Sequence, residues 1–321
     1  MRAAQVTSLT GPGGVEVREL DAPLARPGHV LIDVSSVGVA FPDLLLSQGR
    51  YQIRPEPPFT LGADLAGVVV EDAEGFTQGQ RVAAVMPFGG AAERVAAPAD
   101  GVFPLPDVLS LDEGAALPMN YLTAHFALVE RASLEPGETV LVHGAAGGVG
   151  TATIQVAKAL GARTIAVTST KEKATLARSA GADEAVALDG FKDAAMELTG
   201  GRGVDVVMDV VGGDVFTDSL RALAPQGRLL VVGFAAGQGI PEVKVNRLLL
   251  NNIDVRGVGW GAYALARPGF MRRQWEELLP MIEAGHIRPP VGSTYALDDY
   301  ARALVDLAER RALGKLVVHL R

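Results

Sequence analysis

A glycine-rich turn near the middle of the chain is the segment best suited to bind a ligand. It reads Ala145-Ala146-Gly147-Gly148-Val149-Gly150 and directly follows the apolar run Val140–His143. Glycines at this spacing let the backbone approach phosphate oxygens, and the N–H groups that begin the following helix point at the same place. The turn therefore predicts a binding site for the pyrophosphate of a dinucleotide, formed by Ala145, Gly147, Gly148, Val149 and Gly150, with Ala145 in place of a first glycine. The alternative is a tight strand–helix turn that binds nothing.

The residues after the next apolar run indicate which dinucleotide binds. Thr164–Thr168 is followed by Ser169, and Lys173 lies one helical turn further along. Sites for NAD place an acidic residue here to bond the ribose hydroxyls, and no acid stands at the tip of this run. Because a hydroxyl and a cation favour the 2′-phosphate of NADP, we predict that Ser169 and Lys173 bind NADPH. The alternative is that Lys173 is an ordinary solvated helix residue.

The chain supplies the framework that this site needs between residues 138 and 259. Five helical stretches alternate there with six short apolar runs, which are Val140–His143, Thr164–Thr168, Ala185–Leu188, Val204–Met208, Leu229–Val232 and Ile253–Gly257. Near-continuous apolar strands separated by helices predict a parallel sheet covered on both faces. Six strands with five intervening helices are the count of a doubly wound dinucleotide-binding (Rossmann) domain, which we place at residues 121–261.

The two ends of the chain follow a different pattern. Many short strand-like runs, for example Val30–Ser36 and Arg81–Val85, are separated by Gly and Pro before residue 110, which favours a barrel or sandwich. After residue 259, two helical stretches and a final apolar run, Leu316–Leu320, form a tail too short to fold alone. We therefore expect residues 1–120 and 262–321 to form one domain together.

The composition excludes several classes of protein. The 321 residues carry 29 basic and 37 acidic side chains, and a net charge of −8 gives no attraction to nucleic acid or to an anionic membrane. No apolar run approaches the roughly 18 residues of a membrane span. The N-terminal residues lack the apolar core of a signal peptide. The absence of cysteine excludes disulfides and cysteine–zinc sites and fits a cytoplasmic protein.

Four motifs carry a resemblance that covers nearly the whole chain. They are Val37-Gly38-Val39-Ala40-Phe41-Pro42-Asp43, Pro58-Phe59-Thr60-Leu61-Gly62-Ala63-Asp64-Leu65-Ala66-Gly67, the Ala145–Gly150 turn and Gly314-Lys315-Leu316-Val317-Val318. With them the chain resembles the medium-chain dehydrogenase/reductase superfamily, in particular its zinc-independent quinone oxidoreductase (zeta-crystallin-like) branch. The resemblance implies an α/β protein with a GroES-like β-barrel domain formed by both chain ends and a doubly wound Rossmann domain. It also implies a homodimer, paired through the edge run Ile253–Gly257.

Two alanines distinguish this chain from the zinc-dependent alcohol dehydrogenases, which it also resembles. Those enzymes carry a cysteine ligand where Ala40 stands and a histidine ligand where Ala63 stands. Five scattered histidines lack the spacing of a metal site, and we expect each to be structural: His29, His125, His143, His286 and His319. No bound metal is therefore expected. Ala40 also replaces an asparagine of many zinc-free members, and Leu188 replaces a tyrosine of some NADPH-binding ones.

The resemblance implies roles for individual residues as well. The residues expected beside the nicotinamide are Asn120, Tyr121 and Thr123, and Gly233, Phe234 and Ala235 after the fifth Rossmann strand. Their alternatives are helix capping and packing at the end of the sheet. Lys315 is expected near the cofactor, and its alternative is an exposed strand residue. Tyr51 is the candidate proton donor or substrate clamp, and its alternative is a half-buried loop aromatic.

A site without a metal must reduce a compound that accepts hydride readily. Quinones and conjugated enones qualify, because the incoming charge delocalises onto a carbonyl oxygen. We therefore predict an NADPH-dependent oxidoreductase that transfers hydride to a small-molecule quinone or related conjugated carbonyl compound. An enoyl or 2-alkenal reductase shares all of these motifs, and a non-catalytic NADPH-binding protein shares the cofactor residues, so both remain as alternatives.

Overall fold

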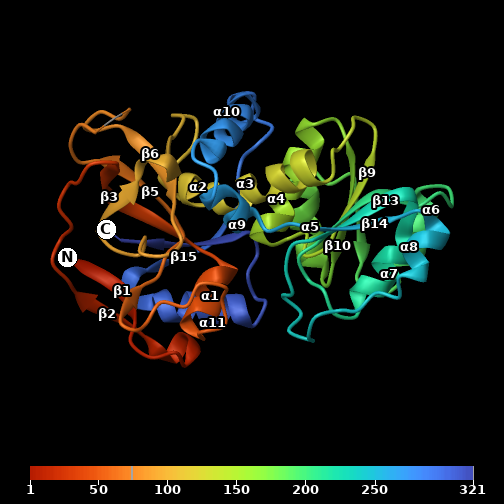
Figure 1. Cartoon of the computed structure of the whole chain (residues 1–321), viewed down its shortest axis with the longest axis horizontal. Coiled ribbons are helices and arrows are strands. Elements are labelled where there is room, and N and C mark those ends of the chain that lie inside the picture. The colour runs from red at the N-terminus through yellow and green to blue at the C-terminus, as the bar shows by residue number, and fades with distance from the viewer. Residues whose placement is uncertain (74, 321) are drawn as a thin grey trace. The chain divides into compact units, whose positions relative to one another are not determined.

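The computed structural model describes residues 1–73 and 75–320, which fall into two compact units (Figure 1). The first unit comprises Met1–Asn120, Pro268–Glu276 and Arg288–Arg321, and the second comprises Tyr121–Arg267 and Glu277–Ile287. Both ends of the chain therefore belong to the first unit. The ranges expected from the sequence differ in two places, because residues 262–267 and 277–287 lie in the second unit.

Helix α10 (Phe270–Glu283) accounts for the second difference. Trp275 stacks on Phe103 of the first unit with ring centroids 4.7 Å apart, whereas Glu277 pairs with His125 of the second unit at 3.0 Å. Successive turns of one helix therefore belong to different units. No change in the sequence pattern marks that division.

The second unit is built on a six-stranded sheet in the order β11-β10-β9-β12-β13-β14, in which every neighbouring pair is parallel. Its strands are β9 (Thr139–Val142), β10 (Arg163–Thr168), β11 (Glu184–Ala187), β12 (Val204–Asp209), β13 (Leu223–Val231) and β14 (Asp254–Gly257). The central strands β9 and β12 are buried along their whole length, whereas the edge strands β11 and β14 are half-buried or exposed. This order and direction confirm the predicted doubly wound fold.

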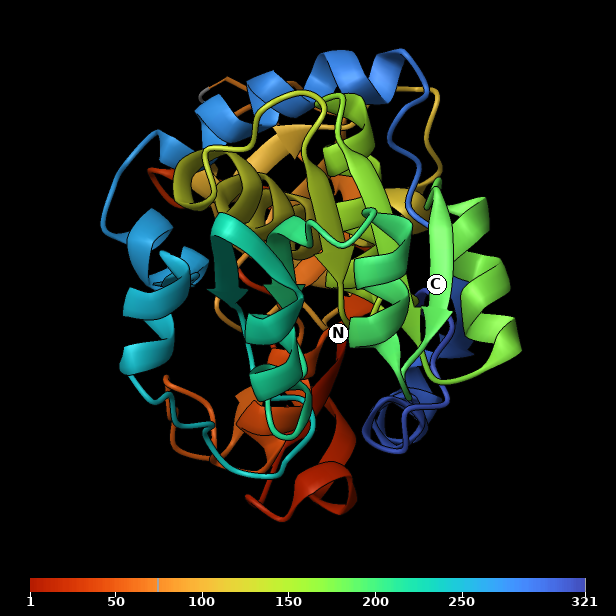
Figure 2. The same cartoon turned by 90° about the vertical axis from the view of Figure 1, so that its right-hand side faces the viewer.

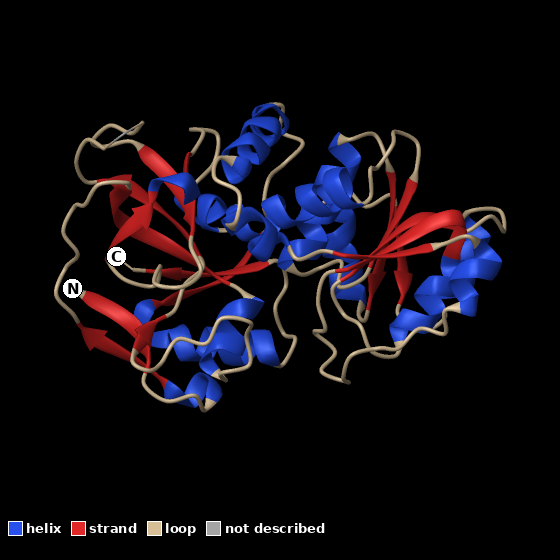
Figure 3. Cartoon of the chain, in the orientation of Figure 1, coloured by secondary structure: helices blue, strands red, loops and turns tan. Residues whose placement is uncertain are grey.

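Helices connect successive strands and cover both faces of this sheet (Figure 3). They are α4 (Gly148–Ala159), α5 (Lys171–Ser179), α6 (Phe191–Leu198), α7 (Val215–Ala222) and α8 (Asn246–Asn251). Figure 2 turns this unit toward the viewer. Helix α3 (Pro118–His125) continues as a π-helix (Phe126–Arg131), and α9 (Trp260–Leu265) follows β14.

The first unit is a largely antiparallel β structure. Its strands are β1 (Arg2–Val6), β2 (Val15–Glu19), β3 (His29–Val39), β4 (Phe59–Thr60), β5 (Asp64–Val69), β6 (Arg81–Val85), β7 (Arg94–Pro98), β8 (Val102–Pro104), β15 (Val291–Ala296) and β16 (Lys315–His319). The C-terminal strand β16 pairs antiparallel with β3, with Leu316 opposite Val39, so the tail returns to the N-terminal part as predicted.

Short helices close this unit around a core from both chain ends. They are α1 (Phe41–Ser47), α2 (Leu111–Ala115) and α11 (Tyr300–Ala308), with 3₁₀ turns at Gly11–Gly14, Ala99–Gly101 and Leu297–Asp299. The core joins Val34 and Leu65 to Tyr300 and Leu316. Among the described residues, no helix has the length and apolar character needed to cross a bilayer.

Candidate functional site

The glycine-rich turn joins β9 to α4, and the helix begins at Gly148. Gly147 precedes the helix with an extended backbone (φ −89°, ψ 175°), and its N–H donates to the Gly144 carbonyl at 2.9 Å. An α-helix leaves its first N–H groups without an intrahelical partner, and here they belong to Gly148, Val149 and Gly150. The turn therefore directs backbone donors and the positive end of a helix dipole at one place.

Two of the glycines have different structural roles. A Cβ atom on Gly150 would lie 2.2 Å from the Gly144 oxygen, so only glycine lets α4 pack this closely on the turn. A Cβ on Gly147 would have only that same oxygen within 4 Å, at 3.3 Å. Gly147, Gly148 and Val149 are half-buried, whereas Ala145 and Gly150 are buried behind them. Apart from this one tight contact, no heavy atom lies within 4 Å of the Gly147 Cβ position, which suits the close approach of a pyrophosphate to the backbone.

Two further loops lie at the same carboxyl edge of the sheet. A Cβ on Gly144 would lie 2.8 Å from Val210 Cγ2, so the turn after β12 lies against the glycine-rich turn. The Val210 carbonyl accepts the Ala235 N–H at 3.1 Å. Gly233, Phe234 and Ala235 are thus connected to the glycine-rich turn through Val210, and Phe234 is 39% exposed. Ligands of doubly wound folds bind at this edge.

Asp209 holds the turn after β12 in place, a role that the sequence analysis missed. Its buried carboxylate accepts the N–H groups of Val211 and Gly212, both at 2.8 Å. Burial raises the pKa of Asp209, while these two hydrogen bonds oppose the rise. A second contact fixes the loop that follows β13, because Gln238 Nε2 donates to Asp214 Oδ2 at 2.8 Å and the Asp214 N–H donates back to Gln238.

The residues expected to recognise the 2′-phosphate lie together at the tip of β10. Lys173 Nζ is 3.5 Å from Ser169 Oγ, and the Thr170 hydroxyl accepts the Lys173 N–H as the N-cap of α5. Ser169 is exposed and Lys173 is half-buried. Glu172 also lies in this first turn, and its own N–H and the Thr170 hydroxyl lower the pKa of its carboxyl. The Lys173 ammonium group and the hydroxyls of Ser169 and Thr170 thus lie together, and the neighbouring Glu172 carboxylate is already hydrogen-bonded.

Helix α3 carries three of the six residues expected beside the nicotinamide. Asn120 is 5% exposed and donates to the Ala116 carbonyl at 3.0 Å. Tyr121 is buried, and its hydroxyl donates to Gln155 Oε1 of α4 at 2.7 Å. Thr123 is 8% exposed. Asn120 is the last residue of the first unit, whereas Tyr121 and Thr123 belong to the second. The hydrogen bond to Gln155 already uses the Tyr121 hydroxyl as a donor.

Tyr51 is half-buried and packs against the core of the first unit. Burial raises the pKa of Tyr51, and the negative charge of Asp43 raises it further. The phenol therefore stays protonated at neutral pH. In that form it can donate a hydrogen bond to a carbonyl oxygen.

Lys315 is not an exposed strand residue, so that alternative was wrong. It is 4% exposed, and its Nζ lies 2.6 Å from Oδ2 of Asp64, which is fully buried. Neither Asp64 nor Asp43 was predicted from the sequence to have a role, although both stand inside motifs that carried the resemblance. Asp43 is fully buried and accepts the N–H groups of Ala40 at 2.8 Å and Gly62 at 3.0 Å. Burial raises the pKa of Asp43 to about 6.

The positions that hold zinc in related alcohol dehydrogenases are apolar and buried here. Ala40 is 5% exposed and Ala63 is fully buried. Within residues 1–73 and 75–320, no three His, Cys, Asp or Glu side chains are grouped to hold a metal ion. His143 hydrogen-bonds Ser219, and His319 pairs with Asp112.

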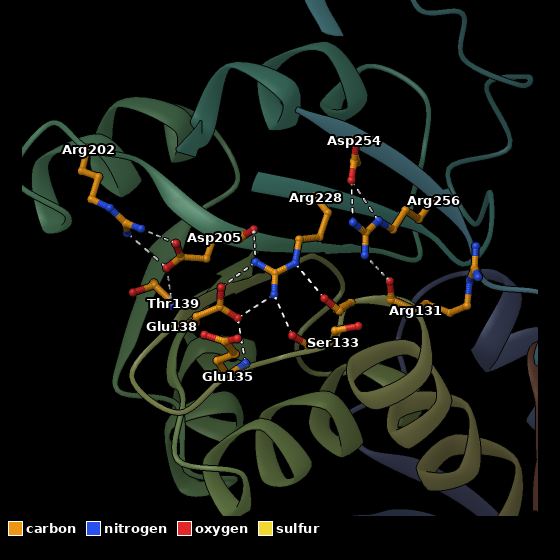
Figure 4. A network of polar contacts seen from close by, with 11 residues as sticks. Arg131, Ser133, Glu135, Glu138, Thr139, Arg202, Asp205, Arg228, Asp254 and Arg256 are labelled. Atoms are coloured by element: carbon orange, nitrogen blue, oxygen red, sulfur yellow. Dashed lines mark hydrogen bonds and ion pairs between the residues drawn. The ribbon is translucent and has the colours of Figure 1, made fainter. Parts of the chain in front are cut away.

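A cavity of about 570 Å³ at the other end of the second unit's sheet is a poor candidate for the site. It is lined by the network around Arg228, an 8% exposed residue of β13 (Figure 4). The guanidinium makes five hydrogen bonds, to both Glu138 oxygens and to the carbonyls of Ala132, Ser133 and Asp205. A guanidinium has five N–H donors, so none is left for a ligand.

Comparisons with known proteins agree with this geometry. Residues 26–107 match the model of the alcohol dehydrogenase GroES-like domain, and residues 148–284 match that of zinc-binding dehydrogenases. The chain is 38% identical over 326 residues to quinone oxidoreductase-like protein 2 of Bos taurus, covering 100% of this chain and 93% of the relative. The chain belongs to the medium-chain dehydrogenase/reductase superfamily. Within it, the chain falls in the zinc-independent quinone oxidoreductase branch.

Solved structures support the same assignment. The quinone oxidoreductase of Thermus thermophilus, also solved with NADPH, is 39% identical with a TM-score of 0.88, and each chain covers 100% of the other. The CurK enoyl reductase is 25% identical with a TM-score of 0.89 and covers 100% of this chain and 99% of its own. The first unit is thus the GroES-like domain and the second the Rossmann domain. The protein is an oxidoreductase that uses a nicotinamide cofactor.

Proposed function

We propose that this protein uses NADPH to reduce quinones and related conjugated carbonyl compounds. The observation that carries the proposal is the placement of two complementary groups at one edge of the Rossmann sheet. The glycine-rich turn offers the backbone donors at the start of α4 for a pyrophosphate, and Ser169 with Lys173 offers a hydroxyl and a cation for a 2′-phosphate. The relatives add support, since one is named a quinone oxidoreductase-like protein and another was solved with NADPH.

The cofactor residues divide by the part of the dinucleotide that they would bind. The N–H groups of Gly148, Val149 and Gly150 suit the pyrophosphate, with Ala145 and Gly147 shaping the turn. By resemblance, the nicotinamide would be bordered by Gly233, Phe234 and Ala235 and by Asn120 and Thr123. When bound, the nicotinamide supplies the hydride.

Reduction of a conjugated carbonyl compound adds one hydride and one proton. Ala40 and Ala63 offer no metal ligand to polarise a carbonyl, so the substrate must delocalise the incoming charge by itself. The protonated hydroxyl of Tyr51 is suited to donate a hydrogen bond to the carbonyl oxygen and then to give up its proton. Protein groups otherwise contribute by orienting the reactants.

The test is turnover of NADPH with purified protein and two substrates, 1,4-benzoquinone and a 2-alkenal. The proposal expects NADPH oxidation with the quinone and a lower kcat/KM with NADH. An enoyl or 2-alkenal reductase is the second candidate, favoured by the likeness to the CurK enoyl reductase, and it would prefer the alkenal. NADPH binding without turnover of either compound would contradict both candidates and indicate a non-catalytic binder.

A further inference from the structure

Three charged side chains are buried together in the GroES-like unit. Asp43 and Asp64 are fully buried and Lys315 is 4% exposed, and such residues are almost never buried unless they are paired. Burial raises the pKa values of both carboxyls, and the charge of Lys315 opposes the rise. The cluster thus holds one cation for two carboxylates. Tyr300, from α11, is fully buried near them, and its hydroxyl has no hydrogen-bond partner among the described residues.

The single cation contacts Asp64 rather than Asp43. Lys315 Nζ lies 2.6 Å from Asp64 Oδ2, whereas the Asp43 carboxylate is held by the N–H groups of Ala40 and Gly62. The Lys315 side chain also has little room to move. A Cβ on Gly38 would lie only 2.6 Å from Lys315 Cε and 2.1 Å from the Ala115 carbonyl oxygen, so the lysine lies directly beside the β3 backbone.

The other oxygen of Asp64 holds the beginning of helix α3. Oδ1 accepts the N–H of Met119 at 2.7 Å. Pro118 opens the helix and has no N–H, so Met119 provides the first of the donors that a helix leaves without an intrahelical partner. One carboxylate therefore joins the first residue of β5 to the first residue of β16 and to the first turn of α3, which carries Asn120.

We propose that Lys315 is a positioning residue rather than a cofactor ligand: through Asp64 it fixes the first turn of α3 and thereby Asn120. The proposal rests on the proposed function in one respect, the role of Asn120 beside the nicotinamide. Lys315 Nζ, 2.6 Å from Asp64 Oδ2, favours the ionised form of the buried carboxyl, and an ionised acceptor bonds the Met119 N–H more strongly than a neutral one. Without the lysine, the buried carboxylate lacks its counter-ion and the helix start loses its anchor.

Removal of the lysine charge alone, and of both charges together, tests this. Lys315→Met leaves Asp64 uncompensated, whereas Lys315→Met combined with Asp64→Asn removes both charges and keeps an oxygen that can accept the Met119 N–H. Lys158→Met is the matched control, because Lys158 Nζ is also 2.6 Å from a carboxylate, that of Asp183, but 39% of its side chain is exposed. Three quantities are measured: hydrogen exchange of the Met119 N–H, the NADPH-dependent hydride transfer rate to 1,4-benzoquinone, and the NADPH Kd at low and high salt.

We expect Lys315→Met to lose protection of the Met119 N–H and to slow hydride transfer by about 10- to 100-fold, the size of effect that a small misplacement produces. The double variant should recover most of both quantities, since no uncompensated charge remains. The NADPH Kd should change little and keep its salt dependence, because a positioning residue makes no bond to a phosphate. Lys158→Met should behave like wild type in all three measurements.

Other results would overturn the proposal in distinguishable ways. If Lys315 instead bound the cofactor, Lys315→Met would bind NADPH much more weakly and with a reduced salt dependence. The double variant would then not recover hydride transfer. A purely structural pair predicts a lower Tm with unchanged Met119 protection and unchanged hydride transfer. If Lys315→Met cannot be purified folded, failure of the double variant to fold or to protect Met119 counts against the proposal. If wild type turns over no quinone, the proposed function fails, and Met119 exchange still decides the role of Lys315.

Discussion

The environment of Tyr51 determines what its hydroxyl can do. Burial and the charge of Asp43 raise its pKa, so it is a hydrogen-bond donor and not a phenolate at neutral pH. Tyr51→Phe keeps the ring packed against the core and removes only the hydroxyl. We expect kcat for quinone reduction to fall by up to ~10²-fold, with little change in the NADPH Kd. Steady-state kinetics and NADPH titration of the two proteins measure this, and an unchanged kcat would reduce Tyr51 to a packing residue.

His143 shows how the hydrogen-bond network fixes a protonation state. The Ser219 hydroxyl donates to the Val215 carbonyl at 2.7 Å, so His143 Nε2–H must donate to Ser219 Oγ, 2.8 Å away. His143 Nδ1 is buried and has no partner among the described residues. Burial lowers the pKa of His143 to about 4, so the folded protein holds the ring neutral.

The lowered pKa of His143 makes stability depend on pH. Below its ordinary pKa of about 6.5 the unfolded chain takes up a proton that the folded protein refuses until about pH 4, so stability falls as the pH falls. The contribution is about 2 kcal/mol between pH 7.5 and pH 5. Asp43, whose pKa is raised to about 6, acts in the opposite direction.

A comparison of wild type with His143→Gln separates the two effects, since the variant keeps the Asp43 contribution. Urea unfolding at pH 7.5 and pH 5 should show a smaller acid loss of stability in the variant. Equal losses in both proteins would mean that His143 is not held neutral.

At the start of α4, two glycine substitutions test folding and binding separately. Gly147→Val places a Cβ 3.3 Å from the Gly144 carbonyl oxygen, a tight contact at an extended backbone that valine tolerates, so folding should persist with a small loss of Tm while NADPH affinity collapses. Gly150→Val forces a side chain into the Gly144 carbonyl and should lower Tm as well as affinity. Thermal unfolding and NADPH titration of both variants test this. Wild-type affinity in Gly147→Val would mean that the pyrophosphate binds elsewhere.

Local pattern predicted most of the elements, because strands and helices of a doubly wound fold differ in length and periodicity. The Ser169–Lys173 pair was also accessible, since residues four apart on a helix start are neighbours. The Asp64–Lys315 pair could not be predicted from the sequence, because 251 positions separate its members. The burial of Lys315 follows from tertiary packing beside Gly38, and no spacing in the sequence encodes it. The five hydrogen-bond acceptors around Arg228 are likewise brought together by tertiary packing and could not be predicted from a spacing in the sequence.

At the scale of the whole molecule, the open edge of β14 is the surface that a second copy would cover. The Val258 N–H donates to the Val231 carbonyl, so alternate residues Val255 and Gly257 direct their backbone groups away from β13. Arg131 Nε already occupies the Gly257 carbonyl at 2.9 Å. Exposed apolar side chains of the neighbouring α8, Leu249 at 75% and Leu250 at 74%, add apolar surface.

We therefore expect a homodimer in solution, formed by pairing of β14 strands around Val255. Sedimentation at micromolar concentration should give a dimer for wild type. The double variant Val255→Pro and Leu250→Glu should give a monomer, because it removes an outward N–H and places a charge on the apolar surface. A monomeric wild type would contradict this prediction.

The ratio of kcat/KM with NADPH to kcat/KM with NADH, measured with 1,4-benzoquinone, is the decisive test of NADPH-dependent quinone reduction through the Ser169–Lys173 site. The variant is Lys173→Ala, and Lys171→Ala, two residues earlier on the same helix, is the control. Wild type should turn over the quinone and prefer NADPH. Lys173→Ala should lower kcat/KM for NADPH by about 10- to 150-fold, toward the low end because the site faces solvent, and leave NADH almost unchanged. Lys171→Ala should match wild type. A wild type that prefers NADH, or a Lys173→Ala variant that loses both cofactors equally, would contradict a 2′-phosphate site at Ser169 and Lys173.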